Sequence, residues 1–439
     1  MDLIGGRWRL LIFWLLTLIA ALEFIARGPA RALSQSGRTF NDFLSPCVQT
    51  RAWLAGRDPY SPQVVAAMWP VLPRPTFVTK ESLDGTLPAK RGLPSPYLPV
   101  AFPVLLPIAL LPWKIAIVLW ILVSIAALFT VTWGLIQLAG GDQDRRLAWM
   151  ISLAVLLFAP VHTAMATSNI VTVVLALGIV ATLCISQNRT MLAGISLAVA
   201  IALKPTVALP FAIYVLASRR RTRVIISAMA VGLLLAAVTV IPGHGAGLWW
   251  RSFLANDHAM FAPGAIDDFS AANPLAFQLV NLQVGLFPVL QDRTVTQALV
   301  LLLFAILLAL WFRAFHRDGQ LGLLDLGVFA SVALLFIYHR FTDAGLLLLA
   351  VAWALCQLQG KLRNFAIICL ALAVPFLIPG ATVLEEFSGK YPAFEKLSRS
   401  PAWDMFILPH EAWLILAMCV VLVAARSWAA RLFVLSQTK

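Results

Sequence analysis

The sequence predicts an all-α polytopic membrane protein. Hydrophobic residues make up 61% of its 439 residues and charged residues only 12%, whereas a soluble domain carries roughly 25% charged residues. The mean hydropathy is +0.87. Apolar runs recur along the whole chain, and many approach the about 20 residues that a membrane-spanning helix needs. We therefore expect a bundle of transmembrane helices without a separate soluble domain.

Measured against that length, the chain is expected to cross the membrane about twelve times. The first run is too long for a signal-peptide core, so we expect it to be a mature helix. Two runs, 147–161 and 169–186, are short enough to be partial crossings. The runs fall near residues 8–27, 97–112, 115–138, 147–161, 169–186, 191–217, 224–242, 294–314, 321–338, 343–358, 364–380 and 411–428.

The basic residues predict the orientation of these crossings. They gather in the turns 219–223, 313–317 and 361–363 and near both chain ends, and cytoplasmic loops carry such an excess of positive charge. We therefore expect both termini in the cytoplasm. One short loop, 142–146, then lies outside with two arginines, against the rule. The formal net charge of +13 is interpreted as a topology signal, because no basic helix or soluble module would present it to nucleic acid.

This topology leaves three sizeable loops on the outer face, 28–96, 243–293 and 381–409, within a single integral-membrane domain, 1–439. Prolines break the first loop into short pieces, so we expect it to lie docked at the membrane surface. Within it, the segment 45–56 predicts a short amphipathic helix. Trp53 is expected to face lipid, and Gln49 and Arg51 to face water.

No metal or cofactor is expected. The five cysteines are scattered, four of them inside apolar runs, and they show neither a CxxC pair nor the spacing of metal ligands. The sequence therefore supports neither a disulfide framework nor a zinc site.

Asp42 is the first candidate functional residue. It lies in FNDF, where the chain returns to the membrane surface after the first run, and an ionisable group near the bilayer is costly to keep without a function. The alternative is that Asp42 caps a short helix that begins near Leu44. Asp58 precedes Pro59 and is expected to form an Asx turn.

Several segments of the chain together resemble a known family. After the first run and an early aspartate come AWLAGRDPYSP at 52–62 and SPYLPVAFPVLLPIALLP at 95–112. An asparagine-containing helix and an Ala-Gly helix with an internal Lys-Pro follow within 168–221, and IYHRFTDAGLLLLA lies at 337–350. In this order the segments resemble glycosyltransferase family 87, the bacterial GT-C mannosyltransferases that use polyprenyl-phosphate sugars. Thr167-Ser168 stands where that family usually has Gly-Gln.

The resemblance implies a GT-C-like bundle with outer-face loops and short juxtamembrane helices. It also implies a polyprenyl-phosphate-sugar-dependent hexosyltransferase of the bacterial plasma membrane with its active site on the outer face. The donor would be a lipid-linked sugar, mannose or alternatively arabinose or another pentose. The acceptor would be a glycolipid or another glycan. We expect inversion at the anomeric carbon, a monomer among membrane lipids, and no nucleic-acid partner.

The resemblance further implies that Asp42 is the catalytic base, because a carboxylate can take the proton of the acceptor hydroxyl as it attacks the sugar. If Asp42 is instead a cap, the base must be sought among other aspartates of the outer loops. These are Asp58, Asp257, Asp267 and Asp268. Tyr97 and Asn273 lie in matched segments and are expected to bind substrate.

The phosphate that leaves the donor needs fixed positive charge. His339 and Arg340 precede Asp343, which is expected to bind substrate, and the His-Arg pair is the most economical phosphate clamp in the chain. The alternative is that Arg340 only reaches toward water and pairs with Asp343. Lys204 lies deep in an apolar run before Pro205, so it needs a partner, either the donor phosphate or a structural carboxylate.

Trp250 in the second outer loop is expected to stack on sugar, although tryptophans are also common at membrane interfaces. Two functions of other classes remain open. A secondary transporter would carry broken helices in matched positions, and only Lys204-Pro205 fits that pattern. A noncatalytic lipid-binding protein would have no use for the long first loop. Convergence of Asp42 with His339 or Arg340 would favour the enzyme.

Overall fold

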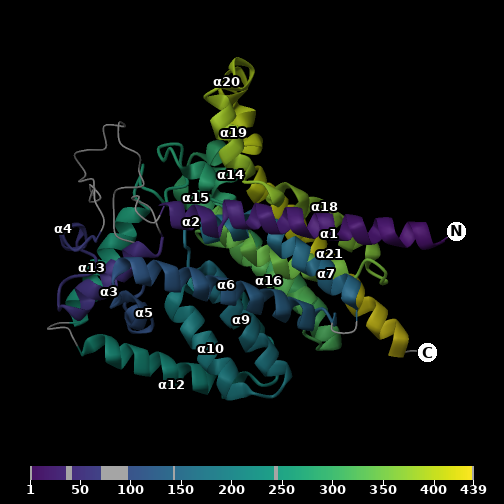
Figure 1. Ribbon diagram of the computed structural model, residues 1–439, viewed down its shortest axis with the longest axis horizontal. Helices are drawn as coiled ribbons and strands as arrows, with labels where there is room; N and C mark the ends of the chain where they lie inside the picture. The colour runs from purple at the N-terminus through teal and green to yellow at the C-terminus, as the bar shows by residue number, and fades with distance from the viewer. Residues whose placement is uncertain (1, 36–41, 71–96, 142–143, 242–245, 438–439) are drawn as a thin grey trace.

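The computed structural model describes residues 2–35, 42–70, 97–141, 144–241 and 246–437 (Figure 1). All regular elements in these ranges are helices, and an isolated antiparallel bridge joins Leu279 and Arg340. The predicted all-α fold class is thus confirmed. The parts of the predicted first loop at 36–41 and 71–96 lie outside the described residues.

The first half of the chain contains long helices interrupted by short ones. In order these are α1 (Asp2–Arg27), α2 (Pro29–Gln35), α3 (Leu44–Leu54), α4 (Pro62–Ala67), η3 (Pro99–Ala101), α5 (Phe102–Ala109), α6 (Trp113–Leu138), α7 (Arg145–Leu157), α8 (Ala159–Ala166), α9 (Val171–Ser186), α10 (Thr190–Leu203), α11 (Pro205–Ala217) and α12 (Arg221–Val240).

The second half follows the same pattern. Its elements are α13 (Ala246–Met260), η4 (Ala276–Gln278), α14 (Leu282–Leu290), α15 (Arg293–Asp318), α16 (Leu323–Phe336), η5 (Phe341–Leu347), α17 (Leu348–Cys356), α18 (Arg363–Ala373), η6 (Val374–Leu377), α19 (Gly380–Ser388), α20 (Pro392–Ser398), η7 (Trp403–Ile407) and α21 (His410–Gln437). The start of α1 and the end of α21 lie at one end of the molecule, and α3 and α4 lie at the other (Figure 1).

The count of about twelve crossings is not confirmed. By length and composition, five described helices could cross a membrane: Leu11–Ser34, Trp113–Leu138, Arg221–Val240, Arg293–Asp318 and His410–Ser436. The number rises to seven if two bent helix pairs each form one span. The other apolar helices have 10–17 residues. At 1.5 Å per residue, most of these are shorter than the hydrocarbon core of about 30 Å.

The core of the bundle is formed by α9, α10, α16 and α17. Nearly every residue of α16 is buried, and this helix packs against α11, α17 and α21. A helix that is apolar on all sides belongs inside a membrane protein or a large core. By contrast, α12 and α15 expose much of their apolar surface, for example Leu233 and Leu302, as expected for contact with lipid.

The prediction that 45–56 forms a helix is confirmed, but the prediction that this helix lies amphipathically at the surface is wrong. The helix α3 forms, but Gln49 and Trp53 are both buried. Arg51 donates from Nε to the carbonyl oxygen of Ala109 (2.6 Å) and from a terminal nitrogen to that of Leu111 (2.5 Å). Since these carbonyls end α5, the arginine finds its partners inside the protein.

Two local features hold other parts of the fold. Asp58 Oδ1 accepts from the backbone N–H of Tyr60 (2.9 Å), which confirms the predicted Asx turn. Arg426 of α21 is 3% exposed and pairs with Asp318 (2.6 Å) and Asp325 (2.7 Å). These contacts join α15, α16 and α21.

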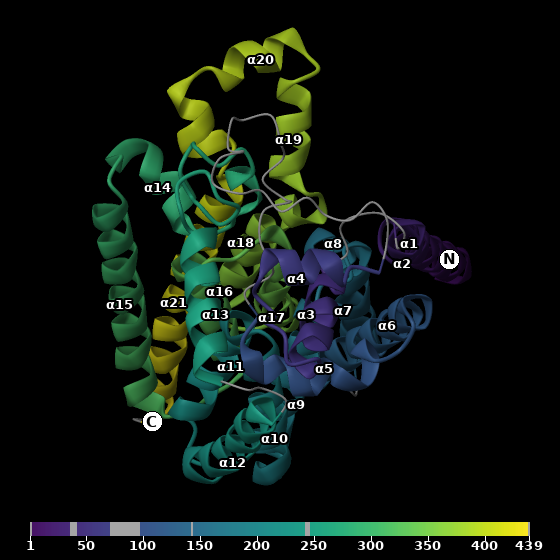
Figure 2. The same cartoon turned by 90° about the vertical axis from the view of Figure 1, so that its left-hand side faces the viewer.

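In another part of the molecule, α19 and α20 form a hairpin that stands away from the bundle (Figure 2).

Candidate active site

Several predicted site residues lie where helices are interrupted. Asp42 precedes α3, Tyr97 precedes η3, and Lys204 separates α10 from α11. His339 and Arg340 lie between α16 and η5. Such breaks let an apolar bundle place polar side chains and free backbone groups at one point.

Asp42 is held by the turn that joins α8 to α9. Its backbone N–H donates to the carbonyl oxygen of Thr167 (2.7 Å), and its carboxylate Oδ2 accepts from Asn169 Nδ2 (2.8 Å). The residue before α3 is Phe43, and that helix start has no side-chain cap. The contacts of Asp42 therefore do not match the helix-cap alternative.

Asp343 is the centre of a buried cluster. Its Oδ1 lies 2.5 Å from Lys204 Nζ, and its Oδ2 lies 3.0 Å from His339 Nδ1. The side chains of Asp343 and His339 are fully buried. Of the two partners expected for Lys204, the structure thus supplies a carboxylate.

His339 has one ring nitrogen left for a ligand. With Nδ1 facing Asp343, the buried Nε2 has no hydrogen-bond partner among the described residues. A buried polar atom without a partner is uncommon, because its desolvation costs about 1–3 kcal/mol. This atom is therefore free to take part in a hydrogen bond with a ligand.

Arg340 does not form the side-chain pair with Asp343 that was the alternative to phosphate binding. Its guanidinium donates to Asp267 Oδ1 (3.1 Å) and, through Nε, to the hydroxyl of Tyr338. The backbone N–H of Val280 donates to the carbonyl oxygen of His339 (3.0 Å). The second predicted outer loop is therefore docked on the segment that carries His339 and Arg340.

The charge of Asp42 influences the pKa values of Arg340 and Tyr97. Burial alone would lower the pKa of Arg340, but Tyr338, Asp267 and Asp42 reverse the effect and raise it. The pKa of Tyr97 is held well above its usual range by burial and then by the negative charges of Asp42 and Asp343. Tyr97 is therefore a neutral hydroxyl near both carboxylates.

Asn273 and Trp250 have other surroundings. Asn273 Nδ2 donates to the carbonyl oxygens of Ile266 (3.1 Å) and Asp268 (2.7 Å), and its Oδ1 accepts from the N–H of Leu275 (2.9 Å). These contacts shape its own loop. Trp250 is 49% exposed and stacks on Phe253 with ring centroids 5.2 Å apart.

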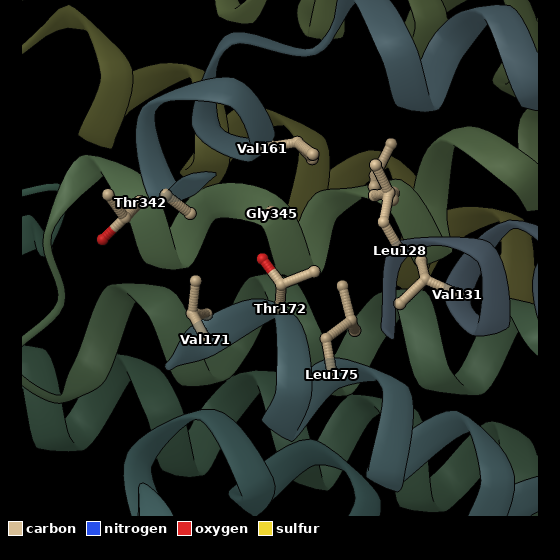
Figure 3. A pocket seen from close by; sticks show the side chains of 10 residues that line it. Leu128, Val131, Val161, Val171, Thr172, Leu175, Thr342 and Gly345 are labelled. Atoms are coloured by element: carbon tan, nitrogen blue, oxygen red, sulfur yellow. The ribbon is translucent and has the colours of Figure 1, made fainter. Parts of the chain in front are cut away.

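A small, mainly apolar cavity is lined by residues that include Thr342 and Gly345 of η5 (Figure 3). It is bounded by α6, α8, α9 and η5, and Thr172 and Thr342 are its polar side chains. The buried hydroxyl of Thr342 has no hydrogen-bond partner in the described ranges. Thr342 precedes Asp343 in the sequence, but none of Lys204, His339 and Asp343 lines the cavity. Asp42 does not line it.

The part of the chain that the structure describes contains no group of three histidine, cysteine, aspartate or glutamate side chains that could hold a metal. One Asp-x-Asp pair occurs in the sequence, at 142–144. Asp144 Oδ1 accepts from the backbone N–H groups of Arg146 (2.9 Å) and Leu147 (3.1 Å), so it caps α7.

Comparison with known families decides the class of the protein. The model of glycosyltransferase family 87 matches residues 96–337, more than half of the chain. The chain belongs to this family. No curated protein and no solved structure matches it. The matched region includes Tyr97, Asn169 and Lys204, and it lies between Asp42 and His339 in the sequence.

Two residues that contact the predicted site residues were not predicted in their observed roles. Asn169 was noted only as part of a motif, although an asparagine just before a helix is a recognised start signal. Asp267 was considered only as a substitute base, and its distance from Arg340 in the sequence hides their contact.

Proposed function

We propose that this membrane glycosyltransferase transfers mannose from a polyprenyl-phosphate donor to a hydroxyl group of a lipid-linked or polymeric glycan. The reaction would take place at the outer face of the bacterial plasma membrane. One observation carries the proposal. The buried cluster of Lys204, His339 and Asp343 leaves His339 Nε2 without a hydrogen-bond partner among the described residues, and the charge of Asp42 acts on the neighbouring Arg340.

In the proposed reaction, Asp42 accepts the proton of the acceptor hydroxyl while the hydroxyl oxygen bonds to the anomeric carbon. The bond from that carbon to the phosphate oxygen breaks, and polyprenyl phosphate leaves with the electron pair. Attack from the face opposite the phosphate inverts the anomeric configuration. General-base catalysis of this kind contributes about 10²- to 10⁴-fold in rate.

The phosphate would be bound by His339 and Arg340. His339 Nε2 is the buried atom that lacks a partner, and a phosphate oxygen would supply one. Arg340 carries a planar fork of donors suited to phosphate, although Asp267 already uses part of it. Lys204 and Asp343 would act through His339, because Asp343 contacts both Lys204 and His339.

Tyr97 would bind substrate near the base. Its raised pKa keeps the hydroxyl protonated, so it can donate a hydrogen bond to the sugar or to Asp42. Trp250 and Asn273 remain proposals for the acceptor side. Trp250 offers an exposed ring for a sugar, and Asn273 would act by shaping the second loop.

The transporter alternative gains one observation. Lys204 has a partner in a second helix break, at Asp343, and paired charges at broken helices occur in transporters. Membership of the glycosyltransferase family decides against it. Asp42, which transport would not require as a base, therefore provides the distinguishing test.

Purified wild-type protein would be incubated with radiolabelled polyprenyl-phosphate mannose and a membrane glycolipid extract. Label should move to a glycolipid or polymer, and an Asp42→Asn sample prepared in parallel should show almost no transfer. A polyprenyl-phosphate arabinose donor tests the alternative sugar. Absence of transfer from both donors, with protein that binds them, would reject the proposed reaction.

A further inference from the structure

We propose that Asn169 is a positioning residue for Asp42. Its side-chain amide holds one carboxylate oxygen, Oδ2, and thereby turns the other oxygen toward the acceptor hydroxyl. The inference rests on the proposed function, in which Asp42 is the base. It adds a residue whose part in the reaction is to aim the carboxylate.

The orientation of the Asn169 amide is fixed by its own contacts. Its Oδ1 accepts from the backbone N–H of Val171 (3.0 Å), so Nδ2 is the atom that faces Asp42 Oδ2, at 2.8 Å. Asn169 is 9% exposed. Because a flipped amide would lose both hydrogen bonds, the donor is locked toward the carboxylate.

The turn that carries Asn169 is itself anchored. Trp120 Nε1 donates to the carbonyl oxygen of Ser168 (2.9 Å), and the Trp120 ring stacks on Phe43 at a centroid distance of 3.9 Å. Ser168 has φ 56°, a left-handed conformation that is uncommon for residues other than glycine. Neighbours on both sides of the contact are thus tied to α6.

Asp42 is held at two points by this turn, at its backbone N–H by Thr167 and at its carboxylate by Asn169. Two points fix a direction, whereas one would leave the side chain free to rotate. Catalysis is sensitive to such direction, since a displacement of about 1 Å can cost about 10²-fold in rate.

An amide is well suited to hold a base. A directly paired cation would stabilise the charged carboxylate strongly and weaken it as a proton acceptor. A neighbouring carboxylate would repel it and raise its pKa. A neutral amide donates a hydrogen bond without adding a charge, so it can orient the carboxylate without either of these effects.

Asn169 also has a structural role that the test must separate. Asn169 precedes the N-cap residue, Ile170, and its Oδ1 accepts from the backbone N–H of Val171, the first residue of α9, so it also supports the start of that helix. Serine and aspartate are both good capping residues. Asn169→Ser keeps a capping oxygen but cannot reach Asp42. Asn169→Asp keeps the same oxygen, replaces the donor with an acceptor, and places a second negative charge beside Asp42.

The experiment measures kcat, the KM for the donor and the melting temperature of the full-length protein across pH. The variants are Asn169→Ser, Asn169→Asp and Asp42→Asn. A control, Asp144→Ala, removes the cap of α7. We expect Asn169→Ser to lower kcat by about 10²-fold with little change in KM. Asn169→Asp should also move the acidic limb of the pH profile upward, because like charges raise a carboxyl pKa. Asp144→Ala should keep the wild-type kcat.

Three results would overturn the inference. The Asn169 variants could keep the wild-type kcat and pH profile while Asp42→Asn is inactive, which would remove only the positioning role. Alternatively, the Asn169 variants could lose melting temperature and activity together, and Asp144→Ala could do the same. Asn169 would then have only a structural role. If Asp42→Asn itself keeps its turnover, the base assignment fails and the positioning role fails with it.

Discussion

Lys204 Nζ lies 2.5 Å from Asp343 Oδ1, and this contact joins two helix breaks that are 139 residues apart in the sequence. Lys204 ends α10 with φ −156°, and Pro205, which has no backbone N–H, begins α11. The contact therefore satisfies a charged side chain at the one place where the helix cannot continue.

Breaking this pair should destabilise the protein strongly. Lys204→Met would leave Asp343 with His339 and the backbone N–H of Arg340 as partners, and removing one member of a buried pair typically costs about 3–5 kcal/mol. The exposed pair of Lys390 and Glu386 provides the control, since Lys390→Met should change the melting temperature very little. Similar melting temperatures for the two variants would show that the buried pair contributes nothing.

The composition of the sequence predicts the all-α class correctly, but hydropathy does not reveal where a helix is interrupted. The run 191–217 was counted as one crossing, but Lys204-Pro205 divides it into helices of 14 and 13 residues. Hydropathy averages over such a break, so a hydropathy profile does not show that the run is divided. The packing of α3 was missed for a related reason. Gln49 and Arg51 suggested contact with water. The carbonyl oxygens that accept hydrogen bonds from Arg51 belong to Ala109 and Leu111, which are distant in the sequence.

The sequence pointed to the charged residues of the candidate site, but it did not show which of them contact one another. Charges stand out in an apolar sequence, so Asp42, Lys204, His339 and Arg340 were identified. The alternative pair of Arg340 with Asp343 assumed helical spacing, but Arg340 is extended, with ψ 167°, and its side chain contacts Asp267 instead. Asn169 is neutral and gave no comparable signal.

The phosphate role of Arg340 predicts a graded response to substitution. Arg340→Ala should weaken donor binding more than Arg340→Lys, because lysine keeps a positive charge but loses the fork. The measurement is the KM and the dissociation constant for the lipid-linked donor. Arg293→Ala is the matched control, since Arg293 pairs with Asp268 in the same loop. Equal donor kinetics for wild type and Arg340→Ala would reject the role.

Asp267 should compete with the donor phosphate for Arg340. Asp267→Asn removes the competing charge, so we expect donor affinity to rise several-fold. Burial raises the pKa of Asp267 above that of an ordinary carboxyl, although Arg340 opposes the effect. Lower pH therefore neutralises Asp267 readily, and wild-type affinity should increase as pH falls while that of Asp267→Asn changes less. Parallel pH curves for the two proteins would contradict this competition.

The orientation in the membrane can be tested by cysteine labelling of intact cells. The positive-inside rule places 219–223 in the cytoplasm and the first loop outside. Arg221→Cys should react with an impermeant reagent only after permeabilisation, whereas Gln63→Cys should react in intact cells. Both positions are exposed, and four of the native cysteines are buried, which lowers the background. Labelling of both positions under the same condition would overturn the topology.

The substitution Asp42→Asn tests the base directly. Asparagine keeps the size of the side chain, and its carbonyl oxygen can still accept from Asn169 Nδ2, so the fold and donor binding should survive. It cannot accept the proton of the acceptor hydroxyl, and turnover should fall by about 10²- to 10⁴-fold. Transfer, melting temperature and donor binding would be measured on the same purified sample.

If Asp42→Asn keeps more than roughly a tenth of wild-type turnover, the loss is smaller than base removal normally causes, and another aspartate must act. The structure orders the candidates. Asp58 is engaged in its Asx turn, and Asp268 accepts from Ser270 and pairs with Arg293. Asp267 would come next, because it contacts Arg340 and its Oδ2 has no hydrogen-bond partner among the described residues. Loss of transfer in Asp267→Asn, with Asp42→Asn active, would then move the base to the second loop.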